Sequence, residues 1–86
     1  ALVGGRLDYL DSRPVAALVY RHRQHVINLF VLPEEVSANT AIQASSRQGY
    51  HVLRWSWEGM HYWAVSDLNL ADLMRFGALL ATPESG

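Results

Sequence analysis

Two histidines beside a short turn are the residues of this sequence best placed to share a metal ion. His22 and His25 are separated by Arg23-Gln24, and in a tight hairpin they would face each other across two strands. Imidazole nitrogen is a common zinc ligand, but a zinc site needs three or four converging ligands. No third ligand lies nearby in the sequence, and the neighbouring arginines add repulsive positive charge. We therefore interpret both histidines as solvated side chains at a turn, and we expect neither a metal nor another cofactor.

Serine, histidine and aspartate also occur within one segment, as nucleophilic catalysis would require. Ser56 and His61 become cross-strand neighbours if the chain turns at Glu58-Gly59, and Asp67 lies at the far end of the second strand. No strained turn or oxyanion-binding loop presents the serine, so we favour ordinary strand residues. The sequence contains no cysteine, which excludes disulfides, zinc–thiolate sites and a cysteine nucleophile. We expect no enzyme activity.

Aromatic residues are concentrated between Tyr50 and Leu68, a segment that holds all three tryptophans. Aromatic side chains can stack on bases or sugars, but proteins that bind single strands in this way also carry a basic groove. The formal net charge is −1 and no basic stripe is visible in the sequence, so nucleic acid is not favoured as a partner. Cores and subunit interfaces are the usual places for such residues. The candidate interface residues are Trp55, Trp57, Tyr62, Trp63 and Phe30.

The turn at Glu58-Gly59 decides which side chains of this aromatic hairpin share a face, because side chains alternate along a strand. A two-residue turn predicts two sets, and both contain large apolar groups. The first set is Leu53, Trp55, Trp57, Met60, Tyr62 and Ala64, and the second is Val52, Arg54, His61, Trp63 and Val65. We expect Arg54 to pair with Asp67 or Asp8.

The elements that must position these residues are five strands and one helix. Apolar runs bounded by turn-forming residues predict strands at about 2–10, 15–22, 25–32, 50–57 and 60–67. Asp11-Ser12-Arg13-Pro14 is typical of a turn between the first two. Residues 33–47 predict a long loop, which is mobile, functional, or contains a short element around residues 41–44.

The predicted helix covers residues 70–81. Asn69 is a good N-cap, and Asp72 suits the positive end of a helix. Apolar residues at helical spacing form a stripe of Leu70, Leu73, Met74, Gly77 and Leu80, and Thr82-Pro83-Glu84 ends the pattern. The whole pattern predicts an α+β fold: an antiparallel sheet of about five strands, with a meander of the first three and one C-terminal helix packed on a face.

Residues 1–86 are expected to form one small domain or a fragment of one. Half of the residues are hydrophobic and only 17% are charged, which suggests that part of the apolar surface is covered by something else. The run Val26–Leu32 is apolar at nearly every position, a pattern typical of a strand covered on both faces. One helix covers a single face, so we expect a second subunit or sequence upstream of Ala1 on the other. No run reaches the roughly 18 apolar residues that a membrane-spanning helix needs.

Three phrases of the sequence together resemble one family. They are LVGGRLDYLDSRPVAALVY, RHRQHVINLFVLP, and GYHVLRWSWEGMHYWAVSDLN followed by a short helix. In order and spacing they look like the C-terminal, extracytoplasmic portion of proteobacterial membrane-spanning anti-sigma factors, also called transmembrane transcriptional regulators. The resemblance runs from Leu2 to about Leu80, apart from residues 33–46.

That resemblance implies a larger protein with a cytoplasmic zinc-binding domain, one transmembrane helix and this domain on the periplasmic side. The cytoplasmic part would hold an extracytoplasmic-function sigma factor inactive, and the outer part would sense or relay an envelope signal. Because this chain has no cysteine, it cannot contain the His-x3-Cys-x2-Cys cluster that the resemblance implies. No site residue is carried over from the family.

The expected function is therefore a periplasmic regulatory or sensor domain that acts through protein contacts, either with itself or with an envelope signalling partner. The expected membrane link is an upstream helix. The alternative is a small-ligand-binding domain in which the aromatic hairpin lines a pocket.

Overall fold

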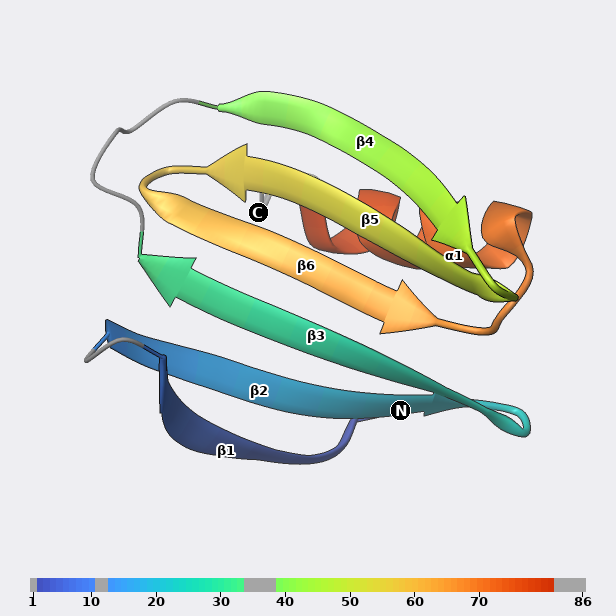
Figure 1. The fold of residues 1–86 in the computed structure, drawn as a ribbon, viewed down its shortest axis with the longest axis horizontal. Helices are drawn as coiled ribbons and strands as arrows, with labels where there is room; N and C mark the ends of the chain where they lie inside the picture. The colour runs from blue at the N-terminus through green and yellow to red at the C-terminus, as the bar shows by residue number, and fades with distance from the viewer. Residues whose placement is uncertain (1, 11–12, 34–38, 82–86) are drawn as a thin grey trace.

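The computed structural model describes residues 2–10, 13–33 and 39–81, which form one antiparallel sheet and one helix (Figure 1). The α+β class is as predicted, but the sheet has six strands and not five. The strands are β1 (Leu2–Leu10), β2 (Arg13–His22), β3 (His25–Pro33), β4 (Thr40–Arg47), β5 (Tyr50–Trp57) and β6 (Met60–Ser66), and the helix is α1 (Leu70–Ala81).

The sheet consists of two three-stranded meanders joined at their last strands. The strand order is β1-β2-β3-β6-β5-β4, so β3 and β6 form the central pair and β1 and β4 are the edges. The predicted meander of the first three strands is confirmed. Phe30 lies opposite Trp63 in the middle of the central pair.

Two-residue turns connect β4 to β5 and β5 to β6. Gln48-Gly49 and Glu58-Gly59 have positive φ at both positions (52° and 85°, 49° and 81°), which is the geometry of type I′ turns. The second of these turns pairs Trp57 with Met60, so the register predicted for the aromatic hairpin is confirmed.

Strand β4 lies in the segment that the sequence predicted as a loop, and the loop prediction is wrong for residues 40–47. The alternative of a short element around residues 41–44 gave the place of this strand but not its length. The strand is at the edge of the sheet and exposes almost every side chain, with only Ile42 half-buried, so it carries no alternating apolar signal. Its start is held by side chains: the Ser56 amide donates to Thr40 Oγ1 at 2.9 Å, and the Glu58 amide donates to Asn39 Oδ1 at 2.8 Å. Residues 34–38 lie outside the described part.

The helix begins where the sequence predicted, directly after Asn69. The Asn69 side chain accepts a hydrogen bond from the Asp72 amide and donates one to the Asp72 carboxylate, both at 2.9 Å. This reciprocal arrangement satisfies a backbone donor that the first turn leaves free. The helix is observed to Ala81, and the residues predicted to end it lie outside the described part.

Helix α1 packs against β5 and β4, behind the sheet in Figure 1. Gly77 permits the close approach, because a Cβ atom there would lie 2.8 Å from Leu53 Cδ1. Phe76 meets Tyr20 edge to face, with ring centroids 5.0 Å apart. Of the predicted apolar stripe, Leu73 and Gly77 are buried, whereas Leu70 and Leu80 are exposed.

The core lies between this helix and the sheet. Its buried members are Ile27, Leu29, Leu53, Trp55, Ala64, Leu68 and Leu73. Each strand member points to the helix side, so the opposite side of the sheet has no helix over it within the described residues. No helix in this part of the chain is long and apolar enough to cross a membrane.

Candidate functional site

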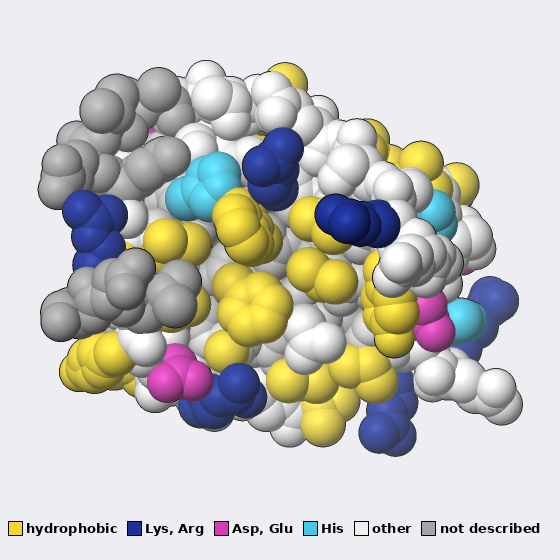
Figure 2. Space-filling view, viewed as in Figure 1, with side chains coloured by type: hydrophobic (Ala, Val, Ile, Leu, Met, Phe, Trp, Pro, Cys, Tyr) yellow, Lys and Arg dark blue, Asp and Glu magenta, His cyan; other side chains and the backbone are white. Residues whose placement is uncertain are grey.

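The face of the sheet opposite the helix carries an apolar cluster, which we call the helix-free patch. It consists of Val26, Phe30, Leu32, Val52, Trp63 and Val65, from three adjacent strands. Trp63 is 42% exposed, and Phe30 beside it is half-buried. Figure 2 shows this face, with hydrophobic side chains gathered at its centre. Exposed apolar clusters of this kind often mark contact sites.

Charged side chains surround the patch. The strands contain six charged residues, and strand alternation together with the observed register places all of them on this face: Arg6, Asp8, Arg13, Arg21, Arg47 and Arg54. The helix-facing positions of the same strands carry no Arg, Lys, Asp or Glu. Five arginines against one aspartate make this face basic, although the formal net charge of the chain is −1.

No basic stripe is visible in the linear sequence, because these arginines come from four strands and lie on one face only in the folded sheet. The expected partner of Arg54 is also corrected. Asp8 lies 3.5 Å from Arg6, and Asp67 lies 2.9 Å from His25. Within the residues that the structure describes, Arg54 makes no ion pair.

The five candidate interface residues lie on opposite faces of the sheet. Trp55 and Tyr62 stack on the helix side, with ring centroids 5.1 Å apart and planes inclined by 5°. Trp57 is half-buried against the same core. Only Phe30 and Trp63 lie on the helix-free face, where they are direct cross-strand partners. The helix-free patch therefore contains two of the five, together with aliphatic residues of β3, β5 and β6.

His61 joins Ser56 and Trp63 in a hydrogen-bonded group at one end of the patch. The Trp63 indole nitrogen donates to His61 Nε2, so Nδ1 carries the proton and donates to Ser56 Oγ at 2.9 Å. A general base would instead have to accept the serine proton. Asp67 bonds to His25 and not to His61. The Ser–His pair thus has the wrong polarity for activating Ser56.

The histidines at the β2–β3 turn do face each other, since His22 pairs with His25 in the register. His25 Nδ1 lies 2.9 Å from Asp67 Oδ1, which gives that ring a partner the sequence did not indicate. The described residues contain no group of three or more side chains placed to hold a metal ion.

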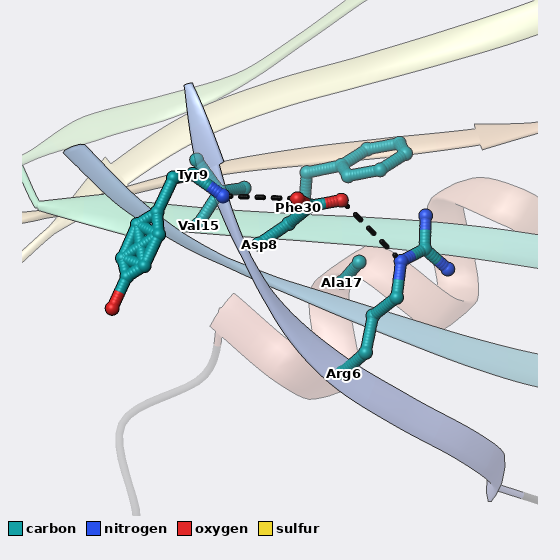
Figure 3. Close-up of a pocket in the computed structure, with 6 residues that line it drawn as sticks. All are labelled: Arg6, Asp8, Tyr9, Val15, Ala17 and Phe30. Atoms are coloured by element: carbon teal, nitrogen blue, oxygen red, sulfur yellow. Dashed lines mark hydrogen bonds and ion pairs between the residues drawn. The ribbon is translucent and has the colours of Figure 1, made fainter. Parts of the chain in front are cut away.

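A hollow of about 180 Å³ lies on the helix-free face beside β1 (Figure 3). Its lining residues are Arg6, Asp8, Tyr9, Val15, Ala17 and Phe30. In Figure 3, Arg6 and Asp8 point toward Phe30, while Tyr9 points to the other side of β1. None of the hairpin aromatics lines this hollow, so the small-ligand alternative, which relied on them, stays a prediction.

Arg6 and Asp8 were not predicted to lie on this face. The alternation of charged and apolar residues from Arg6 to Tyr9 was a usable signal, because it predicts a strand with two different faces. Comparison of the chain with models of protein families, with curated proteins and with solved structures finds no match.

Proposed function

We propose that this chain is a non-enzymatic regulatory module that binds another protein through the helix-free patch. The observation that carries the proposal is the adjacency of Phe30 and Trp63 at the centre of this face. Binding energy at protein interfaces concentrates in a few central aromatic residues surrounded by less critical contacts. The exposed indole ring of Trp63 is the main candidate for such a residue.

The arginines define the chemistry of the partner. A matching protein segment places apolar side chains on the centre of the patch and carboxylates near Arg54 and Arg47 at its border. Charge complementarity of this kind raises the association rate and selects the partner. Aliphatic neighbours such as Val52 and Val65 favour a protein over a nucleic acid, which uses stacking rings along a basic groove.

The setting that we propose is the periplasmic side of an inner membrane, with this chain as the outer domain of a membrane-anchored anti-sigma factor. Its support is the resemblance of the three sequence phrases from Leu2 to about Leu80. In that setting, contact between the patch and an envelope protein would control release of the sigma factor from a cytoplasmic domain. The sigma factor itself would bind outside this chain.

The test uses the intact parent protein in its own host, with a reporter for the promoters of the co-encoded sigma factor. Trp63→Ser and Phe30→Ser should change the reporter response to envelope stress by about tenfold, equivalent to the loss of a modest interface residue. Leu79→Ser is the matched control, because Leu79 is an exposed apolar residue on the helix. An unchanged response in both patch variants would contradict the proposed function.

The gene upstream of Ala1 gives a second test. A segment of about 20 apolar residues preceded by a His-x3-Cys-x2-Cys cluster is expected. Its absence would remove the anti-sigma setting and leave the protein-binding module. Binding of single-stranded DNA or RNA that Trp63→Ser abolishes would instead contradict a protein partner.

A further inference from the structure

The two edges of the sheet differ in what they expose. Edge strands present unpaired backbone groups that can pair with another chain. β4 lies on the side covered by α1 and displays mostly serine, threonine, glutamine and arginine. β1 lies at the far edge, where Leu7 is 65% exposed and Tyr9 is 64% exposed. β1 is therefore the apolar edge of the molecule.

The sequence of β1 around Leu7 is complementary to itself in charge. Arg6 and Asp8 flank Leu7 and point to the helix-free face, where both are well exposed and lie 3.5 Å apart. In an antiparallel pair of two copies centred on Leu7, Arg6 of each copy lies directly opposite Asp8 of the other. Oppositely charged residues in directly facing positions stabilise a strand pair.

The same register also suits the other face of β1. Leu7 meets Leu7 of the second copy, and Tyr9 lies opposite Gly5, whose bare backbone an aromatic ring can cover. Gly5 is already close to β2, because a Cβ atom there would lie 2.7 Å from Leu18 Cδ2. The segment from Gly5 to Tyr9 pairs regularly with β2, since the register shift of this pair lies earlier, between Leu2 and Gly4.

Neighbouring registers are excluded by the same geometry. Facing residues must point to the same side of the sheet. The two-fold axis must therefore lie midway between the two copies of one residue of β1, which then faces its own copy. An axis at Arg6 would place two arginines face to face, and an axis at Asp8 would place two aspartates face to face. Only an axis at Leu7 gives two ion pairs.

We propose that two copies of this chain associate edge to edge through β1, antiparallel, with the two-fold axis at Leu7. The two six-stranded sheets then continue as one sheet, and the helix-free patches of both copies lie on the same side of it. This contact does not rest on the proposed function, because it uses the edge of the sheet and leaves the patch free.

The test measures the mass of the chain in solution by sedimentation velocity over a range of concentrations up to about millimolar, where weak self-association is detectable. The wild-type chain should form dimers. Arg6→Asp and Asp8→Arg should each weaken the dimer by about tenfold or more, because each variant places like charges opposite one another twice. An equimolar mixture of the two variants should restore dimers, since one copy presents two carboxylates and the other two guanidinium groups.

This mixture separates the intermolecular pairs from the pair within each chain, because both variants have lost the latter. Arg47→Asp and Glu58→Arg are the matched controls, with the same charge changes on β4 and at the β5–β6 turn. They should dimerise like the wild type, alone and mixed. Leu7→Lys, which places two ammonium groups at the axis, should also be monomeric, and circular dichroism verifies the fold of every variant. A monomeric wild-type chain, or a variant mixture that stays monomeric, would overturn the proposal.

Discussion

The two faces of the β5–β6 hairpin use the same residue types for different purposes. Trp55 is 1% exposed, stacks on Tyr62 and lies under the helix. Trp63, on the next strand, is 42% exposed and donates a hydrogen bond to His61 on the helix-free face. The face of the sheet to which a tryptophan points therefore decides whether it stabilises the core or remains exposed. The charged residues of the strands are divided in the same way, since all six lie on the helix-free face.

The largest effect that this comparison predicts is the difference between two tryptophan substitutions. Trp55→Ala should reduce the free energy of unfolding by about 3–5 kcal/mol, because it leaves a cavity in the core. Trp63→Ala should cost less than about 1 kcal/mol, as is usual for exposed positions. Urea denaturation at low temperature measures both values. Equal losses of unfolding free energy in the two variants would show that the helix-free face is as important to stability as the face that the helix covers.

Trp55→Phe refines that measurement. The indole nitrogen of Trp55 is buried without a hydrogen-bond partner in the described part of the structure. Phenylalanine keeps an aromatic ring against Tyr62 and removes this unsatisfied donor, whose burial carries a free-energy cost. Its loss of stability should be much smaller than that of Trp55→Ala.

A substitution at the contact of helix and sheet should have the next largest effect. Gly77→Val places methyl groups where a single Cβ atom would already lie 2.8 Å from Leu53 Cδ1 and 3.4 Å from Ile42 Cδ1. The resulting overpacking should destabilise the chain by about 1–3 kcal/mol. Ala78→Val places the same β-branched side chain at the neighbouring exposed position, away from Leu53, and is the comparison variant. A thermal melt in which both variants coincide would contradict the close approach at Gly77.

The helix cap should contribute less. Asn69→Ala removes both hydrogen bonds to Asp72 and should cost about 1 kcal/mol of unfolding free energy. Asn69→Ser keeps a side-chain acceptor for the Asp72 amide and should recover most of that loss. If the serine variant is no more stable than the alanine variant, the cap contributes little to holding the helix on the covered face.

The smallest change to the molecule comes from Trp63→Phe, which should leave stability nearly unaltered. It should, however, remove most of the tryptophan fluorescence that acrylamide quenches easily, because Trp63 is the exposed tryptophan and Trp55 is buried. Trp57, which is half-buried, should contribute an intermediate component. Unchanged quenching in this variant would mean that the core tryptophans are accessible and that the two faces do not differ as described.

The sequence predicted the parts of this fold that local chemistry determines. The turn at Glu58-Gly59 set the register and therefore the two sides of the hairpin, and Asn69 marked the start of the helix. The side that the helix covers could not be predicted, because both sides of β5 and β6 carry large apolar groups. The full extent of β4 was missed, beyond the short element considered around residues 41–44, because an exposed edge strand needs no apolar pattern.

The candidate site was predicted less completely than the fold. Trp63 and Phe30 were named, but their adjacency depends on the pairing of β3 with β6, which joins residues far apart in the chain. The basic border depends in the same way on four strands meeting in one sheet. That another protein covers the helix-free face stays a prediction.

The central pair of strands has a consequence for how the chain folds. Within each meander the strands are sequence neighbours, whereas the β3–β6 seam joins Ile27 to Ser66 and Pro33 to Met60. Contacts between residues distant in sequence form late, because closing a long loop costs entropy first. The two meanders should thus act as separate folding units that dock in a final, slow step. A chain divided between residues 33 and 39 is then expected to yield two fragments that reassemble along this seam when mixed.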